Sequence, residues 1–546
     1  MSFSDGINAT LNKMKLFLWR VTMFNYKLKK EVYLFQRFMN WVESFCNKLP
    51  SPGILFLFLF VITAVFSYVL NLAKIVVTHP VTGVVSPIRN FFSREGLYWF
   101  LEHMISNFTS FPPLGIVLVM TVAVGFCENS GLIETILWSK IKNINQHFLP
   151  YFVAFIGILG NIATDTAIIV FPPIAGLIYL VSGRHPIAGM ICGYASVQAG
   201  FSANLIMSGV DALLQSITQD VVDDFLGTGK VIIDVSCNWF FMIASTFLCT
   251  LVIGFFCNKL IEPCFGKYIP SKDFNFYQKK VSTERNKKAL FWAIISIVIF
   301  FIIVVVATIW GPLGIIVGHE ATGNRGFVGS YLLKYLVTII VFFFAIPGIV
   351  YGQVSGNVKG LNGIYQSTIK ILGNMGEYLA FCFFCSQFQQ LFSWTKIDTL
   401  IAISGSNFLK NTGLTGFKLI VFFILFSSLI NVFIPSASAK WTIMAPVFIP
   451  MMIMCNNYHP AMTQLFYRIG DSATNAFTPV SAYIWIMLKE AQEKYDPNIK
   501  IGKLTSSLLS IGIILLFFWI IFLWLWMLCK LPIGPGVTNF IMSYQK

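Results

Sequence analysis

Two short stretches place charged and polar side chains inside long apolar runs. In the first, SASAKW, Ser436 and Ser438 precede Lys440 and Trp441. A lysine near the centre of a bilayer costs ~2.5–3.5 kcal/mol on insertion scales, so a lysine at such a place is expected to have a function. The serine hydroxyls and nearby carbonyls can bind a cation or a polar ligand, and the indole offers an aromatic face. The alternative is a lysine at a hairpin base whose ammonium reaches the membrane surface.

The second stretch, YRIGDSATN, carries Arg468 and Asp471 three residues apart, on one face of a helix. One interpretation is an internal ion pair. The other is an arginine that clamps a substrate carboxylate bidentately, with an aspartate that binds the coupling ion or proton. Asn475, Thr478 and Pro479 follow, as expected for a helix that unwinds.

The first half of the chain has polar groups in similar surroundings. AGFSANLIMSGVDALL, at residues 199–214, carries Ser202, Asn204 and Asp211, and Asp165 lies in the apolar-flanked stretch GNIATDT. We consider Asn204 a substrate-binding candidate. The other three are candidates for coupling to a proton or sodium ion, together with Asp471 and Asn475. Each aspartate has an alternative role as the cap of a broken helix.

The composition of the chain places these residues in a membrane protein. The 546 residues are 56% hydrophobic and 11% charged, with a mean hydropathy of +0.74. Several apolar runs approach the ~20 residues that cross a bilayer as a helix. Strand-like alternation is absent, so we predict an all-α polytopic membrane protein rather than a barrel. The net charge of +15 lies mainly in loops, which favours membrane orientation over nucleic-acid binding as its cause.

Periodicity and charge together predict the topology. We expect nine transmembrane helices, near 52–74, 112–127, 187–209, 235–258, 289–311, 330–352, 375–393, 462–489 and 504–530. Two further runs, 148–182 and 416–455, are long enough to cross twice but are broken by polar residues. If each is a re-entrant hairpin, residues 1–50 and 259–288 share one side of the membrane. Each of these two segments has eight Lys and Arg against three acids, so the positive-inside rule makes that side cytoplasmic.

This assignment divides the chain into two membrane halves. The expected divisions are a basic cytoplasmic segment 1–50, a first half 51–258, a cytoplasmic loop 259–288, a second half 289–534 and a tail 535–546. A shift of 274 residues places Pro172 on Pro446 and His185 on His459. The two halves then run in opposite directions, and inverted repeats with interrupted helices are typical of secondary transporters. No cleavable signal is expected, and the first span serves as the insertion signal.

At these motifs the sequence resembles the AbgT family of p-aminobenzoyl-glutamate transporters, from about residue 40 to 537. The stretches that carry the resemblance are GNIATDTAIIVFPPIAGLIYLVSGRHPIAG, GFSANLI with VDALL, SASAKW with APVFIPM, YRIGDS with TPVSAY, and LPIGPGV. The resemblance implies a homodimer, with nine spans and two hairpins per protomer. It also implies uptake of p-aminobenzoyl-glutamate or export of sulfonamide antimetabolites, driven by a proton or sodium gradient. The family's pathway residues carry over onto Asp211, Ser438, Trp441, Pro460, Arg468, Asp471 and Pro479.

We therefore expect a secondary active transporter in the plasma (inner) membrane, with no cofactor beyond H⁺ or Na⁺. Lys440 and Arg468 would balance the two carboxylates of p-aminobenzoyl-glutamate, and Trp441 would stack on its ring. Sodium is the one metal considered, and its ligands are not assigned. A dicarboxylate or citrate transporter of related architecture is the nearest alternative, and a channel is another. No HExxH, GxSxG or paired-aspartate protease motif is found, so we do not expect an enzyme.

Overall fold

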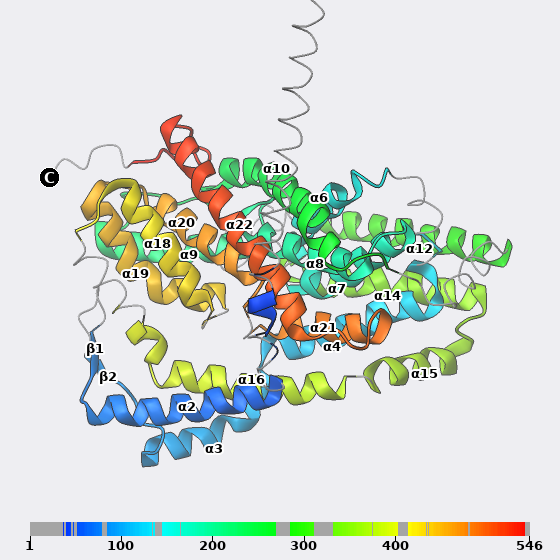
Figure 1. Ribbon diagram of the computed structural model, residues 1–546, viewed down its shortest axis with the longest axis horizontal. Coiled ribbons are helices and arrows are strands. Elements are labelled where there is room, and N and C mark those ends of the chain that lie inside the picture. The colour runs from blue at the N-terminus through cyan, green and yellow to red at the C-terminus, as the bar shows by residue number, and fades with distance from the viewer. Residues whose placement is uncertain are drawn as a thin grey trace, which may run out of the picture.

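The computed structural model is a bundle of helices with one small ribbon of two strands (Figure 1). It describes residues 37, 40–44, 47, 52–78, 85–133, 135–136, 145–163, 165–268, 284–310, 331–373, 375–401, 404, 413–432, 434, 436–478 and 481–540. The ribbon pairs β1 (Val76–Thr78) with β2 (Val85–Pro87) in antiparallel fashion.

The helices of the first half are α2 (Pro52–Leu72), α3 (Arg94–Thr109), α4 (Pro112–Ser130), α6 (Leu149–Gly160), η2 (Asn161–Ala163), α7 (Asp165–Val181), α8 (Pro186–Ala199), η3 (Gly200–Ser202), α9 (Gly209–Leu226), α10 (Trp239–Phe256), η4 (Cys257–Ile261) and η5 (Glu262–Cys264). Those of the second half are α12 (Glu284–Ile309), α13 (Tyr331–Lys334), α14 (Leu336–Ser355), α15 (Gly360–Gly373), α16 (Gly376–Trp394), α18 (Gly416–Asn431), α19 (Ala437–Asn456), α20 (Pro460–Asn475), α21 (Ala482–Lys494) and α22 (Ile501–Leu528).

Many of these helices have the length and composition of membrane spans. Among the described residues, seven segments qualify: Gly53–Leu72, Arg94–Ser130, Trp239–Cys264, Glu284–Ile309, Leu336–Ser355, Ala437–Met454 and Ile501–Leu528. Three shorter apolar helices are Leu149–Ala163, Thr166–Val181 and Gly416–Asn431. The predicted all-α polytopic architecture is thereby confirmed. Nine crossings and their orientation stay predictions.

Two predicted spans are broken in the structure. The segment 187–209 is helical only as α8 and the short η3, and a separate helix α9 begins after Ser208. The segment 462–489 is divided into α20 and α21. Sequence analysis expected unwinding after Asn475, and α20 does end there. It did not predict α9 or the amphipathic helix α15 as separate elements, because neither is a long apolar run.

Both interrupted runs form two helices joined by a short break. α6 and α7 flank η2, and both pack against α8, while α18 and α19 both pack against α20. Glycine permits this close approach. A Cβ on Gly189 of α8 would lie 2.6 Å from the carbonyl oxygen of Ala175, and one on Gly470 of α20 would lie 2.6 Å from that of Ile424. Small residues at helix contacts are the usual way in which membrane helices pack tightly.

The helices that follow the two breaks begin alike. His185 is the N-cap of α8 and His459 the N-cap of α20, and a proline is the first residue of each helix. Burial lowers the pKa of His185, and the nearby Glu262 and Asp496 offset part of that shift. These equivalent positions agree with the repeat inferred from a shift of 274 residues.

The base of the first broken segment lies at the start of α22. Near this base, Gln146 Nε2 donates to the carbonyl oxygen of Ser182 at 3.1 Å, and Arg184 forms an ion pair with Glu262. Just beyond η5, the ring of Phe265 lies 5.4 Å from Lys503 Nζ, in the first turn of α22.

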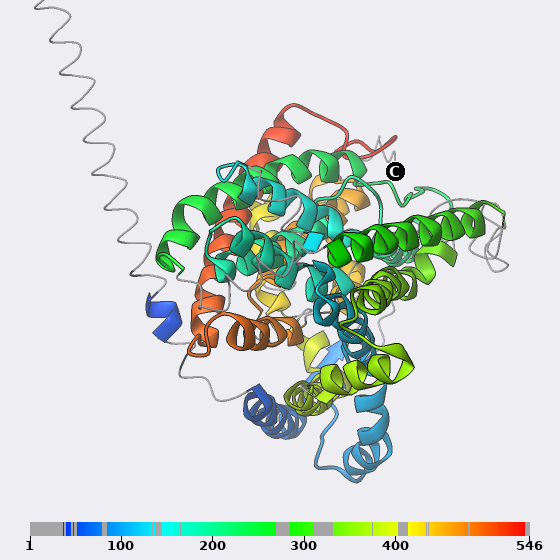
Figure 2. The ribbon, with the colours of Figure 1, turned by 90° about the vertical axis from the view of Figure 1, so that its right-hand side faces the viewer.

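The base of the second broken segment lies beyond the other end of α22. There Gly416 N donates to Asn456 Oδ1 at 3.0 Å, and His459 N donates to the carbonyl oxygen of Asn539 at 3.2 Å. Asn539 follows α22 in the chain. The two broken segments therefore open toward opposite ends of α22, which runs obliquely through the bundle (Figures 1 and 2). This is the arrangement that inverted repeats require.

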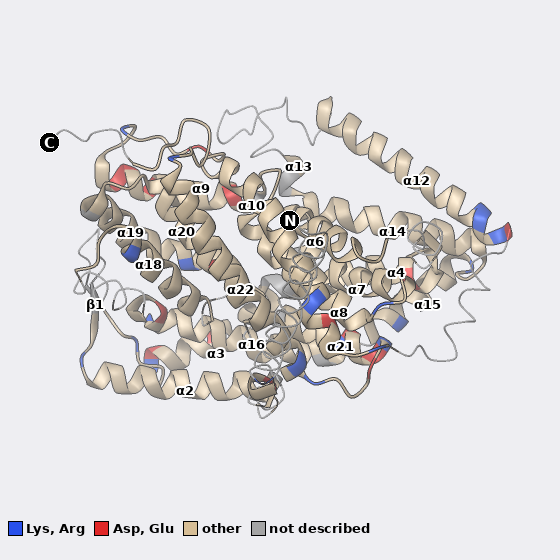
Figure 3. Cartoon of the chain, turned by 45° about the horizontal axis from the view of Figure 1, so that its top comes forward, with Lys and Arg blue, Asp and Glu red and all other residues tan. Residues whose placement is uncertain are grey.

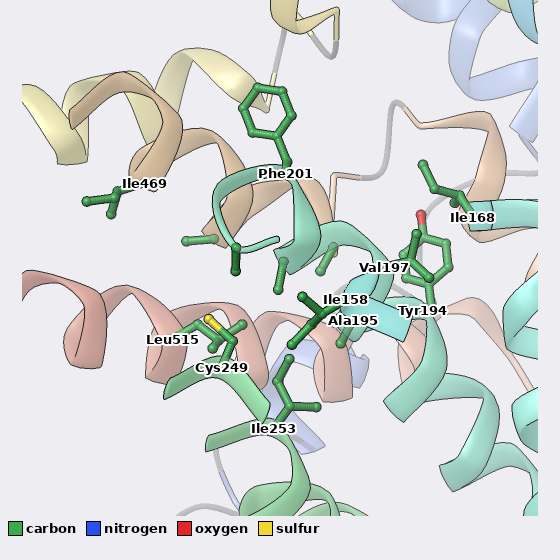
Figure 4. Packing of buried hydrophobic residues seen from close by; sticks show 14 of the residues in the cluster. Ile158, Ile168, Tyr194, Ala195, Val197, Phe201, Cys249, Ile253, Ile469 and Leu515 are labelled. Carbon is green, nitrogen blue, oxygen red and sulfur yellow. The ribbon is translucent and has the colours of Figure 1, made fainter. Parts of the chain in front are cut away.

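The core between these helices is apolar and tightly packed. Ile158 of α6, Cys249 and Ile253 of α10 and Leu515 of α22 converge there (Figure 4). Cys382 and Cys385, which the sequence suggested pack as small apolar residues, are free thiols buried in α16. Figure 3 shows a largely uncharged bundle, with charges at helix ends and a few among α18, α19 and α20. Lys440 and Asp471, which sequence analysis singled out, are buried in this part of the bundle.

Candidate functional site

Lys440 lies in the first turn of α19, directly after the break. Ser436 is the N-cap, and its Oγ accepts from Ala439 N at 3.4 Å. The side chain of Lys440 points into the bundle toward α18 and α20, where it is fully buried. The ammonium therefore does not reach the membrane surface, which was the alternative considered for this residue.

A buried polar network surrounds the Lys440 ammonium. Nζ forms an ion pair with Asp471 of α20 and donates to Asn431 Oδ1 of α18 at 2.6 Å. Asn431 Nδ2 donates to Asn475 Oδ1 at 2.6 Å, and Asn475 Nδ2 donates to Asp471 Oδ2 at 3.3 Å. The ammonium also lies 5.1 Å from the ring of Tyr467. The network joins three helices through one lysine and one carboxylate.

Arg468 pairs with a helix of the other repeat. Its Nη1 lies 2.5 Å from Asp211 Oδ1, and Nη2 donates to the carbonyl oxygen of Phe201 in η3. Asp211 Oδ2 accepts from Ser208 N at 2.6 Å, as part of a capping box at the start of α9, and it also accepts from Ser208 Oγ at 2.9 Å. An ion pair between Arg468 and Asp471 was one interpretation of the sequence. It is wrong, because each charge pairs with a residue of another helix.

One donor of this arginine remains available. The Nε–H of Arg468 is buried and has no hydrogen-bond partner among the described residues. Buried donors are usually paired, so an unpaired one calls for an explanation. A carboxylate of a ligand that approached the guanidinium edge would satisfy it.

Trp441 is held between the two repeats. Its indole stacks on Tyr467, with ring centroids 4.5 Å apart, and its Nε1–H donates to Thr218 Oγ1 of α9 at 2.9 Å. Thr218 in turn donates to Gln464 Oε1 at 2.6 Å. One face of the indole is therefore covered by a tyrosine in this conformation. The rest of the side chain is buried as well, so stacking of Trp441 on a substrate ring stays a prediction.

Two further polar candidates of the first half lie in or just after η3. The hydroxyl of Ser202 accepts from Ser472 Oγ at 2.6 Å, which joins η3 to α20. Asn204 Nδ2 donates to the carbonyl oxygen of Ile158 at 3.3 Å, where α6 approaches its end. The structure thus brings Ser202 and Asp211 to the same side of α20 as Arg468.

Other candidates are farther away or outside the described residues. Ser438 is half-buried near the break. Pro460 starts α20, and at ~1.5 Å per residue it lies ~12 Å along the helix axis from Arg468. Pro479 and the side chain of Asp165, the first residue of α7, lie outside the described part.

Sequence reasoning missed several residues that complete the networks. Asn431, Tyr467 and Thr218 contact the predicted residues directly. An asparagine just before a break, in an otherwise apolar run, was a signal for Asn431. The S-x-x-D spacing of Ser208 and Asp211 is a recognisable capping box. Nothing along the chain pointed to Thr218, since its role depends on which helices meet.

Groups of three or more His, Cys, Asp or Glu that could hold a metal ion are absent from the described residues. A separate cavity of about 690 Å³ lies among α2, α4, α7, α15, α16 and α21. None of the residues predicted from the sequence lines it. The buried charge networks and this cavity are therefore two different sites.

Comparisons with known proteins agree on one family. The model of the AbgT putative transporter family matches residues 37–541. The chain is 32% identical over 497 residues to the p-aminobenzoyl-glutamate transport protein of Escherichia coli (strain K12), covering 91% of this chain and 96% of that protein.

Two solved structures are similar over nearly their whole length. The YdaH transporter of Alcanivorax borkumensis, reported to have an unusual topology, is 31% identical with a TM-score of 0.55, covering 89% of this chain and 100% of that chain. MtrF of Neisseria gonorrhoeae, described with a class of antimetabolite efflux pumps, is 33% identical with a TM-score of 0.53, covering 92% and 100%. These relatives are transporters, not enzymes.

Proposed function

The chain belongs to the AbgT family of membrane transporters, and from this premise we propose that it carries p-aminobenzoyl-glutamate or a related aromatic carboxylate, driven by a proton or sodium gradient. The E. coli relative, named for p-aminobenzoyl-glutamate transport, supports the substrate. The observation that carries the proposal is the pair of buried cations, Lys440 and Arg468, each held by an aspartate beside a broken helix.

The two ion pairs suggest how substrate and coupling ion depend on each other. When a substrate carboxylate takes the place of Asp211 at Arg468, the aspartate is left without its cation. An unpaired buried charge is costly, so binding requires a proton or a sodium ion at the released carboxylate. The same reasoning applies to Asp471 at Lys440. Binding of the acid and of the ion are thereby linked, which is symport.

Both coupling ions fit the oxygen atoms of these groups. A proton would bind a released aspartate directly. Sodium would take Asp211 together with hydroxyls such as those of Ser202 and Ser472, which lie 2.6 Å apart. Asn475 and backbone carbonyls at the breaks provide further oxygen ligands near Asp471.

Uptake of labelled p-aminobenzoyl-glutamate into proteoliposomes, with sodium and proton gradients imposed separately, tests the proposal. Saturable uptake that needs one gradient is expected and would name the ion. Asp471→Ala and Lys440→Ala are then expected to lose uptake. Folded protein that takes up nothing under either gradient would contradict the proposal.

Two further possibilities are distinguished by the same assay. The likeness to MtrF supports export of sulfonamide antimetabolites as a second candidate, tested by loading vesicles with a sulfonamide. A dicarboxylate or citrate transporter would lack a subsite for the ring, so ring-free dicarboxylates would compete as well as the aromatic acid. We further propose a homodimer in the plasma membrane with its N-terminus in the cytoplasm. Light scattering of the purified protein tests the dimer.

A further inference from the structure

The cavity of about 690 Å³ is built mainly from apolar and aromatic side chains. Ile54 and Leu57 of α2, Phe381 and Phe384 of α16 and Trp485 of α21 are among those that line it. Ligand sites typically have volumes of roughly 300–1,000 Å³, with apolar walls and a few polar groups that orient the ligand. The cavity has the size and wall chemistry of a binding site.

One wall of the cavity also belongs to the outer surface of the bundle. Ile54 is 49% exposed and Leu57 is 46% exposed, and both project from α2, one of the seven span-like segments. In a membrane protein, exposed apolar side chains on a spanning helix face lipid. A hydrocarbon chain can therefore enter the cavity sideways from the bilayer.

The polar end of the cavity lies where helices end. Glu128 is near the end of α4, and Lys494 is the last residue of α21. Lys494 Nζ lies 2.7 Å from Glu128 Oε1 and 2.8 Å from Glu490 Oε2, so its charge is shared between two carboxylates. Charged side chains gathered at the ends of helices favour the headgroup region of a bilayer over its centre, which is where we place this end of the cavity.

The lining charges are balanced. Three lysines and three glutamates contribute: Lys370, Lys489, Lys494, Glu128, Glu490 and Glu493. Lys489 lies 3.9 Å from Glu493, and Lys370 has no ion-pair partner within the described part of the chain. A lipid headgroup with a single charge would meet equal numbers of opposite and like charges in this cavity. A zwitterionic headgroup can pair its positive group with a glutamate and its negative group with a lysine.

We propose that this cavity binds a zwitterionic lipid whose headgroup carries both an ammonium and a phosphate. The acyl chains lie against the apolar walls of α2 and α16. The phosphate lies at Lys370, and the ammonium lies at Glu493. This inference does not depend on which substrate the protein transports.

Native mass spectrometry of the full-length protein, released from membranes of equal phosphatidylethanolamine and phosphatidylglycerol content, tests the proposal. Phosphatidylethanolamine is expected to be retained over phosphatidylglycerol. Ala380→Trp, which fills the cavity from α16, is expected to lower that retention at least tenfold. Leu379→Trp is the matched control, because Leu379 is the preceding residue of α16 and does not line the cavity.

Charge variants test the headgroup separately and avoid a bulky substitution. Lys370→Gln is expected to weaken retention of phosphatidylethanolamine about tenfold, the factor for one lost charge-assisted hydrogen bond. Lys359→Gln, an exposed lysine just before α15 that does not line the cavity, is expected to change nothing. Glu493→Gln makes the lining net positive and should shift retention toward phosphatidylglycerol.

A folded Ala380→Trp protein, judged by its unfolding temperature, that still retains phosphatidylethanolamine would overturn the proposal. So would equal retention of the two lipids by the unaltered protein. An unchanged lipid preference in Glu493→Gln would refute the placement of the ammonium.

Discussion

At the residue scale, the main finding is that each buried cation has its own aspartate on another helix. Lys440 pairs with Asp471 and Arg468 with Asp211. Removing one partner of a buried pair leaves an uncompensated charge, which typically costs ~3–5 kcal/mol, whereas removing both can be nearly neutral. The two ion pairs therefore contribute little net stability to the fold. Their main effect is to determine which carboxylates a substrate can displace from Lys440 and Arg468.

This predicts a strongly non-additive response at the first pair. Lys440→Met and Asp471→Asn should each lower the unfolding temperature in detergent, because each leaves a polar or charged group buried alone. The double variant should be more stable than the sum of the two losses implies. Losses that simply add would show that the two groups do not interact.

At Arg468 we expect geometry to matter as much as charge. Arg468→Lys keeps the charge but loses the planar fork that can bind a carboxylate bidentately. Uptake of p-aminobenzoyl-glutamate should fall at least tenfold, while the protein still reaches the membrane. Arg94→Lys, an exposed position on α3, is the control and should transport normally. Normal uptake by Arg468→Lys would remove the clamp from the mechanism.

Which charged residues are buried could be predicted from the sequence more reliably than their ion-pair partners. Lys440, Arg468, Asp471 and Asp211 stand out because charges in apolar runs are rare. The three-residue spacing suggested Asp471 as the ion-pair partner of Arg468, because the two residues share a helix face. The true partner, Asp211, lies in the other repeat, and no local pattern reveals which distant helices meet.

At the element scale, the breaks in the helices are what bring polar groups to the interior. α19 begins after a break and so places Lys440 in its first turn, opposite the α20 face that carries Asp471. The polar breaks and the repeat could be predicted from apolar run length and matching prolines. The separate helix α9 could not, because its moderately polar sequence fits a surface loop equally well.

Close packing of α20 on α18 gives a test of this arrangement. Gly470→Ala adds a Cβ 2.6 Å from the Ile424 carbonyl oxygen, so the helices must separate. We expect a loss of about 1–3 kcal/mol in unfolding free energy, as for overpacking in other cores. Gly373→Ala is the control, because a Cβ there meets nothing within 4 Å and alanine favours a helix. Equal effects of the two variants would contradict the close contact.

At the scale of the whole molecule, α22 relates the two broken segments. Its first turn lies beside the base of one, and the chain that follows it lies at the base of the other. The opposed orientation was predicted from the distribution of lysine and arginine, which acts on the whole chain at once. That is why topology could be inferred while individual contacts could not.

The predicted orientation can be measured with a native cysteine. Cys529 follows α22 and is exposed, and it is expected on the outer side. In a variant whose other cysteines are replaced by serine, a membrane-impermeant maleimide added to intact cells should label the protein, and Cys529→Ser should remove the label. Labelling only after the membrane is opened would place the C-terminus inside and reverse the topology.

The repeats also differ in chemistry. The shift of 274 residues that aligns them puts Thr166 where the other repeat has Lys440, and Val197 where it has Asp471. The ionic and amide contacts that Lys440 and Asp471 make at the second break therefore have no charged counterpart at Thr166 and Val197 of the first. In an alternating-access cycle the two openings then have different activation enthalpies, because parting buried charges costs enthalpy that parting apolar surfaces does not. Cooling should slow the opening at the ionic break more than the opening at the other break. The ratio of the two conformations, each with one break open, should therefore change with temperature.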